Sequence, residues 1–222
     1  APETDLTITL SNGATIVIAA GETTGTSSAF AIQGDDPYVD GSVETLTIDS
    51  TAGGNYEQLD ATDTALVTVE DTIDATTVSF NDPVVDEGGN ITLTATLDNP
   101  ADGALTINLD NGETITIADG ASSGSVTFLA PDDVYQGGND FDVAIDSTSG
   151  GNFEQLITND VANITVNDDL DTTTISIDDV TVDEGSGTAT IDASVDNAPE
   201  TDLTITLSNG ATIVIAAGET TG

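Results

Sequence analysis

Carboxylates are the side chains of this sequence with the most chemistry to offer. Of the 222 residues, 41 are Asp or Glu, whereas Lys, Arg, His and Cys are all absent and the formal net charge is −41. Two carboxylates about 4 Å apart repel by roughly 1 kcal/mol in water and about 4 kcal/mol near a protein surface. No basic side chain can relieve this repulsion, so the neutralising charge must come from solution. A hard divalent cation with oxygen ligands suits such clusters, and calcium accepts them most readily.

The acids gather in short segments that also carry turn residues. A single acid in a loop is usually only solvated, but several such segments that meet at one end of a domain predict a metal site. There is no EF-hand loop and no glycine-rich calcium-binding nonapeptide. The segments are Asp86-Glu87-Gly88-Gly89, Asp110-Asn111-Gly112, Pro131-Asp132-Asp133 and Asn167-Asp168-Asp169, and the acidic linkers are residues 70–74 and 168–172.

Several functional classes are excluded by composition. Nucleic acid and anionic membrane surfaces are not direct partners, because binding them requires cationic side chains. No apolar run approaches the 18 residues of a membrane-spanning helix. Without His, Cys, Lys or Arg, only carboxylate-pair catalysis of the glycosidase kind remains. A chain with no Trp and only three Tyr lacks aromatic sugar platforms, so the sequence does not predict an enzyme.

The chain repeats itself. Residues 198–222 are identical to residues 1–25, and the loop AGGNYEQL at 52–59 returns as SGGNFEQL at 149–156. We interpret residues 1–73 as the C-terminal part of one repeat, 74–170 as a complete repeat, and 171–222 as the N-terminal part of the next. Joining 171–197 to 1–73 would restore a whole unit, which makes end-to-end complementation between truncated repeats an expected contact. Without it, the two incomplete repeats are expected to fray.

The complete repeat predicts seven strands and no helix. Apolar residues alternate along residues 91–98, with Ile91, Leu93, Ala95 and Leu97 facing inward, and the first strand is kinked at Pro83. Short strands at this spacing predict an all-β chain of tandem Ig-like Greek-key sandwiches in a linear array. The expected strands are residues 77–85, 91–98, 105–109, 114–117, 125–129, 141–145 and 162–166.

The GGN-aromatic-EQL loop lies at the opposite end of this sandwich from the acidic segments. We expect Tyr56 or Phe153 to pack back onto the sandwich. The alternative is that Glu57 or Glu154 reaches the calcium ion of the preceding linker.

The run TTVSFNDPVVDEGGNITLTATLDNPADGALTINLDNG, with PDDVY and SGGNFEQL, resembles the extender repeats of giant bacterial RTX biofilm adhesins of the large-adhesion-protein type. It is also similar to the wider Calx-β group, whose pattern runs from an acidic-Gly turn to an Asp-Asp loop and an acidic tail. The resemblance implies an extracellular calcium-binding sandwich on the bacterial cell surface. The ligands that it implies, with the linker acids, are Glu87, Asp132, Asp133, Asp168, Asp169 and Asp171, then Asp35, Asp36, Glu70, Asp71 and Asp74, and finally Glu184.

The function that these observations favour is a calcium-stiffened spacer that projects a distal binding domain for adhesion and biofilm formation. Its expected partners are calcium ions and the neighbouring repeats. The alternative is a ligand-binding module in which the sandwich presents a glycan- or ice-binding face, such as its rows of alternating threonines. An array of near-identical units favours the spacer, because a specific ligand site rarely needs so many copies.

Overall fold

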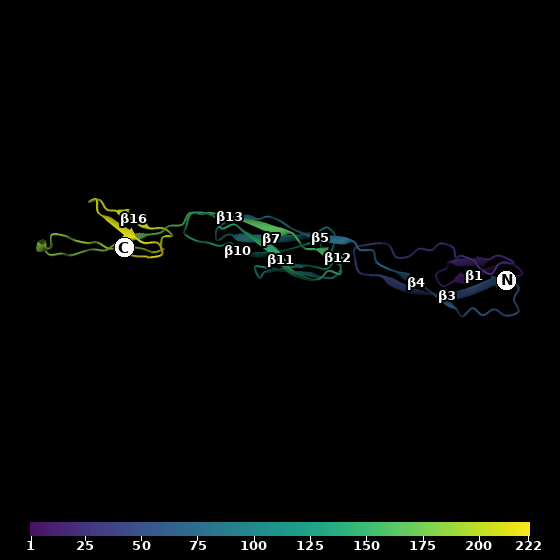
Figure 1. The fold of residues 1–222 in the computed structure, drawn as a ribbon. Coiled ribbons are helices and arrows are strands. Elements are labelled where there is room, and N and C mark those ends of the chain that lie inside the picture. The colour runs from purple at the N-terminus through teal and green to yellow at the C-terminus, as the bar shows by residue number, and fades with distance from the viewer. The chain divides into compact units, whose positions relative to one another are not determined.

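The computed structural model describes all residues 1–222 and confirms that the chain is all-β. Figure 1 shows the strands, and the only helical element is a single 3₁₀ turn at Glu184–Ser186. No helix is long and apolar enough to cross a membrane. The chain divides into two compact units, one of residues 1–80, 94–125 and 144–160, the other of residues 81–93, 126–143 and 161–222. Each junction between successive repeats therefore lies inside one unit.

Residues 74–170 form two sheets with Ig-like connections. The first sheet has the order β10-β7-β5-β12, and the second has the order β6-β13-β11-β8-β9. The chain thus changes sheets between β5 and β6, and β6 then pairs in parallel with the last strand, β13. The strands are β5 (Ala75–Phe80), β6 (Val84–Asp86), β7 (Asn90–Leu97), β8 (Leu105–Leu109), β9 (Thr114–Ile117), β10 (Ser123–Leu129), β11 (Phe141–Gly150), β12 (Gln155–Ile157) and β13 (Val161–Asn167).

Alternation along the strands builds the core. The four residues predicted to face inward from β7 are at most 4% exposed, and the predicted turn between β8 and β9 is present. In that turn Gly112 has a φ of +89°, which favours glycine, and the Asn111 side chain accepts a hydrogen bond from the Glu113 N–H at 3.0 Å. Asn12 and Asn209 accept the same bond in the other two copies.

One predicted strand differs from the structure. Residues 77–85 are not continuous, because Asn81, Asp82 and Pro83 separate β5 from β6. Proline lacks the N–H that a sheet ladder needs, and the Pro83 carbonyl instead accepts a hydrogen bond from the Thr165 N–H at 3.0 Å. The three-residue strand β12, which pairs in parallel with β5, was not predicted.

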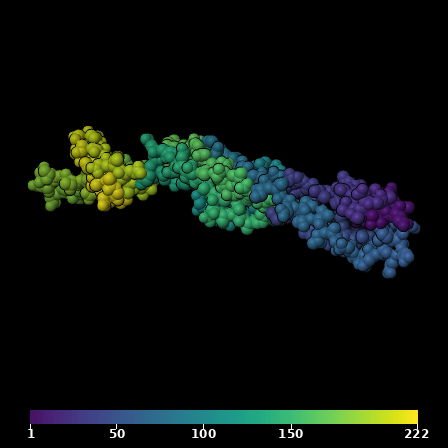
Figure 2. Space-filling model, turned by 45° about the vertical axis from the view of Figure 1, so that its right-hand side comes forward, coloured from purple at the N-terminus to yellow at the C-terminus, as the bar shows by residue number.

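The two outer segments form sheets of their own. Residues 1–73 form a sheet of order β2-β1-β3-β4, whereas residues 171–222 form two strand pairs, β14-β15 and β16-β17. Side chains in these segments such as Leu66, which is 69% exposed, are poorly covered. Figure 2 shows the surfaces of these segments in purple to blue and in green to yellow. The strands are β1 (Leu6–Leu10), β2 (Thr15–Ile18), β3 (Ser42–Gly53), β4 (Thr64–Val69), β14 (Ile175–Ile177), β15 (Ala193–Val195), β16 (Leu203–Thr206) and β17 (Thr212–Ile215).

Candidate metal centre

Glu87 is held at the centre of the acidic end of the middle repeat by its own backbone and that of the next two residues. Its N–H donates to the Asn167 carbonyl at 3.0 Å, just beyond the pairing of β6 with β13. The Gly88 N–H donates to the Pro131 carbonyl at 3.0 Å, and the Gly89 carbonyl accepts from the Ala130 N–H at 2.9 Å. The loop after β6 is thereby tied to the loop after β10 and to the end of β13.

The two glycines of this loop are required by its geometry. Gly88 has a φ of +64°, in the left-handed region, and a Cβ on it would contact the carboxyl carbon of Asp132 at 3.4 Å. A Cβ on Gly89 would lie only 2.7 Å from the Asp86 carbonyl oxygen. The two glycines therefore permit the tight backbone turn that carries Glu87.

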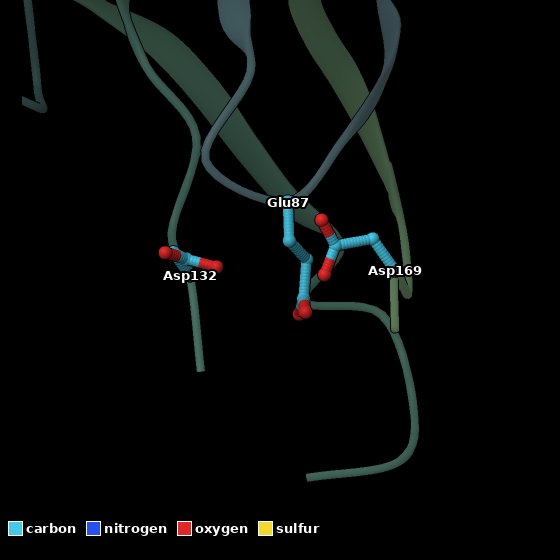
Figure 3. Close-up of side chains that lie close together, drawn as sticks. All are labelled: Glu87, Asp132 and Asp169. Carbon is cyan, nitrogen blue, oxygen red and sulfur yellow. The ribbon is translucent and has the colours of Figure 1, made fainter. Parts of the chain in front are cut away.

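Three carboxylates meet at this point. Glu87, Asp132 and Asp169 each offer an oxygen, and these oxygens all lie within 4.8 Å of one another. Figure 3 shows Glu87 extending from its loop, with Asp169 turned toward it on one side and Asp132 on the other. Glu87 is only 5% exposed, whereas the two aspartates are exposed. We call these three residues the Glu87 cluster. No other group of three carboxylate oxygens in the chain is so close.

Only one of the two carboxylate oxygens of the buried Glu87 has a hydrogen-bond partner. Its Oε1 accepts a hydrogen bond from the Asn139 amide at 3.0 Å, and the same amide donates to Asp133 Oδ2 at 2.9 Å. Its Oε2 is buried and has no hydrogen-bond partner. A buried charged oxygen without a partner is unfavourable, and this sequence has no basic side chain to pair with it. The donor set therefore fits a hard cation.

The electrostatics of the site reflect burial and the crowding of carboxylates. Burial raises the pKa of Glu87 above its ordinary value of 4.5, and the charges of Asp133 and Asp168 raise it further. Burial also raises the pKa of Asp169, with Asp171 and Asp132 adding to the effect. The pKa of Asp133 is instead lowered, because Asn139 and the Tyr135 N–H donate hydrogen bonds to it. Like charges thus oppose full ionisation of the cluster.

These shifts predict that the calcium-free protein becomes more stable as the pH falls from 7 to about 5. Because the pKa of Glu87 is raised in the folded protein, protonation of Glu87 favours the folded state. This stabilisation is complete below pH 4.5, the ordinary pKa, and is lost as the pH rises through the raised pKa of the folded protein. Asp133 has the opposite sign, but its contribution is lost only as the pH falls through a pKa below 3.8. Urea midpoints measured in EDTA at several pH values should show the rise, and Glu87→Gln should reduce it. A midpoint that is constant over this range in the unsubstituted chain would contradict the prediction.

Of the other ligands expected in the middle repeat, Asp133 and Asp168 lie near enough to Glu87 to raise its pKa, and Asp171 lies near enough to Asp169 to do the same. Asp133, Asp168, Asp169 and Asp171 line one depression beside Tyr135. Asp110, in another segment expected to meet there, instead accepts a hydrogen bond from the Ala144 N–H within β11 at 3.1 Å. Asn139 was not anticipated as a partner of Glu87, because an amide in a Gly-Gly-Asn-Asp stretch gives no metal-binding signal in a single sequence.

A second acidic depression lies where the first segment meets the middle repeat. The expected ligands Asp35, Asp36, Glu70 and Asp71 line it together with Asp40 and Glu154. Burial and the charges of Asp36 and Asp71 raise the pKa of Asp40. Glu154, from the following repeat, accepts a hydrogen bond from the Asp74 N–H at 2.6 Å. This position matches the alternative in which the EQL glutamate reaches the preceding linker.

Glu184, the ligand expected from the third segment, lies in the 3₁₀ turn and is exposed. Its sequence context, Asp183-Glu184-Gly185, matches Asp86-Glu87-Gly88 of the middle repeat. Glu184 does not belong to a close group of three carboxylates.

Sheet order and acidic loops together define a class, that of Ig-like β-sandwich repeats with a carboxylate cluster at one end. The model of the LapA domain family matches residues 1–72, 74–169 and 171–222, so the chain belongs to the LapA domain family and is adhesin-related. A search of curated proteins finds no match. Among solved structures, the I9–I11 tandem from titin is 8% identical with a TM-score of 0.22, and the match covers 77% of this chain and 56% of that one.

Proposed function

We propose that this chain is a calcium-stiffened extender of a bacterial cell-surface adhesin, which holds a distal binding domain away from the cell. The observation that carries the proposal is the buried, unpartnered Glu87 Oε2 among three carboxylates, in a chain without any basic side chain. Membership of the LapA family supports the adhesin-related part. The extracellular location and the role in adhesion and biofilm formation are parts of the proposal.

Calcium is the cation that suits the site best. It takes six to eight oxygen ligands in a flexible arrangement, whereas magnesium demands near-ideal octahedral geometry and gives up its waters reluctantly. The Glu87 cluster has one buried and two exposed carboxylates, and Asp133 and Asp168 lie near enough to shift the pKa of Glu87. Water can complete the coordination at the exposed side. Extracellular calcium modules of this kind bind at about 10⁻⁴–10⁻³ M.

Stiffening follows from where the acids lie in the chain. Asp168, Asp169 and Asp171 belong to the linker that leaves β13, while Glu87 and Asp132 belong to loops of the sandwich itself. Like charges at these positions repel without a cation, and a bound ion would join the linker to the sandwich. At the preceding junction Glu154 of one repeat shares a depression with acids of the other, so a cation there would contact both repeats.

Small-angle scattering tests this function on the whole chain. Replacing EDTA with excess calcium should increase the maximum dimension and narrow the distribution of interatomic distances, because neutralised linkers hold adjoining repeats in fewer orientations. Magnesium at the same concentration should have a weak effect and controls for ionic strength. A broad distribution that is the same in EDTA and in calcium would limit calcium to stabilising single repeats and defeat the spacer mechanism.

A further inference from the structure

A tyrosine joins each repeat to the next at both junctions. The Tyr38 hydroxyl donates to the Pro100 carbonyl at 2.7 Å, and the Tyr135 hydroxyl donates to the Ala198 carbonyl at 2.7 Å. Both tyrosines follow an Asp-Asp-x sequence, and in both the second aspartate accepts a hydrogen bond from the tyrosine N–H. Pro100 and Ala198 occupy equivalent places, three residues after the ends of β7 and β15. The contact is therefore part of the repeat and is not peculiar to one junction.

At the first junction the contact is wider than one hydrogen bond. The Tyr38 ring lies against the Phe153 ring, with centroids 5.9 Å apart and planes inclined by 31°. Around this pair the Val39 N–H donates to the Asn152 carbonyl, and the Glu154 N–H donates to the Pro37 carbonyl, both at 3.0 Å. The loop before β3 is thus bridged to the turn between β11 and β12. None of these bonds involves a carboxylate or needs a cation.

The turn that receives the tyrosine has a special backbone. Asn152 has a φ of +50°, and a Cβ on Gly151 would lie 2.8 Å from the Phe153 ring. The ring therefore rests on its own Gly-Gly-Asn turn and offers its other side to Tyr38. The first segment has the same turn, with Asn55 at a φ of +58° and a Cβ on Gly54 2.9 Å from Tyr56. The Tyr56 side chain is 44% exposed.

We propose that the Gly-Gly-Asn-aromatic turn, with the Pro100 carbonyl that follows β7, is a docking surface for the Asp-Asp-x-Tyr segment of the preceding repeat. The partner is another repeat of the same kind. Docking holds adjoining repeats together without metal and restricts how they can meet. The inference builds on the proposed spacer role, but it concerns a separate contact whose test does not require calcium to bind.

Pulsed electron paramagnetic resonance on the full chain can test the docking. The sequence has no cysteine, so Thr68→Cys and Thr96→Cys, at exposed positions of β4 and β7, would carry the only two spin labels. In EDTA the labelled parent should show a narrower distribution of interlabel distances than the variants that remove the contact, and calcium should narrow it further. Tyr38→Ala or Phe153→Ala should reduce the docking equilibrium about tenfold, because an aromatic contact or a hydrogen bond with its surroundings is removed. Tyr38→Phe, which loses only the hydroxyl, should reduce it about fivefold.

Tyr56→Ala is the matched control, because it removes the equivalent aromatic side chain, which is 44% exposed and lies outside the contact between Tyr38 and Phe153, and it should leave the distribution unchanged. Tyr38→Ala also guards against misfolding of the middle repeat, since it lies outside residues 74–170. A distribution in EDTA that is equally broad in the parent and in Tyr38→Ala would overturn the docking proposal. If calcium narrowed the distribution of interlabel distances in every variant, the proposed calcium function would still be supported. The docking proposal and the calcium proposal can therefore be contradicted independently of each other.

Discussion

Excess calcium is expected to raise the unfolding temperature of the middle repeat by about 6–20 °C. A site that binds at about 10⁻⁴–10⁻³ M contributes roughly 1.4–2.7 kcal/mol when calcium is in 10- to 100-fold excess. For a domain of this size each kcal/mol corresponds to about 4–8 °C. The physical reason is that the ion binds the Glu87 cluster only when folding has brought its three carboxylates together.

Differential scanning calorimetry of the whole chain in EDTA, in calcium and in magnesium measures this effect. Magnesium should give a much smaller shift than calcium at the same concentration, and sodium chloride of matched ionic strength controls for general screening of the −41 charge. Equal melting temperatures in EDTA and in excess calcium would show that the Glu87 cluster is not a calcium site.

Replacing Glu87 with Gln is expected to lower the calcium affinity of the middle repeat by at least about tenfold, since even the loss of an outer-shell partner typically costs about 10- to 100-fold. The substitution keeps the shape of the side chain and removes the charge of the buried, unpartnered oxygen. In EDTA at neutral pH the same variant should be more stable than the parent, because an uncompensated charge has gone. Lower affinity combined with higher metal-free stability distinguishes a lost ligand from a damaged fold.

Isothermal titration calorimetry supplies the affinity, and Asp142→Asn is the control. Asp142 is exposed on β11 and outside the Glu87 cluster, so the change removes one unit of charge without removing an expected ligand. The triple set Glu87, Asp133 and Asp168 changed to amides should likewise bind calcium more weakly than the set Asp119, Asp142 and Asp146. Equal losses in the two sets would place the site elsewhere.

The strands of the middle repeat were predictable because they depend on local signals. The alternation of apolar and polar residues predicted which side chains of β7 face inward, and the Asp-Asn-Gly sequence predicted the turn after β8. The change of sheet between β5 and β6 was harder to predict, because a kink at Pro83 does not indicate with which strand the chain pairs next. The short parallel pairing of β12 with β5 joins residues far apart in sequence and has no local pattern of its own.

For the site, the sequence indicated which acids to consider but not which of them meet. Glu87, Asp132 and Asp169 come from three loops, and their convergence depends on backbone bonds such as that from Gly88 to Pro131. The burial of Glu87 and its hydrogen bond with Asn139 depend on the tertiary structure, and residue spacing in the sequence does not indicate them. Phe153 was expected to pack onto its own sandwich; its ring does rest on its own turn, but its contact with Tyr38 depends on a neighbouring repeat.

The parallel pairing of β6 with β13 has a mechanical consequence. In a tether under tension, force enters the middle repeat through the strand that precedes β6 and leaves it through the linker after β13. Since the two strands run in the same direction, opposite pulls slide one along the other, and the ladder from Thr165–Val84 to Asn167–Asp86 is loaded in shear. Its hydrogen bonds then share the load and must break together, instead of opening one at a time as in a zipper. Glu87 and Asp169 follow the ends of these same two strands, so an ion held between them would fasten the pair where the outgoing force is applied.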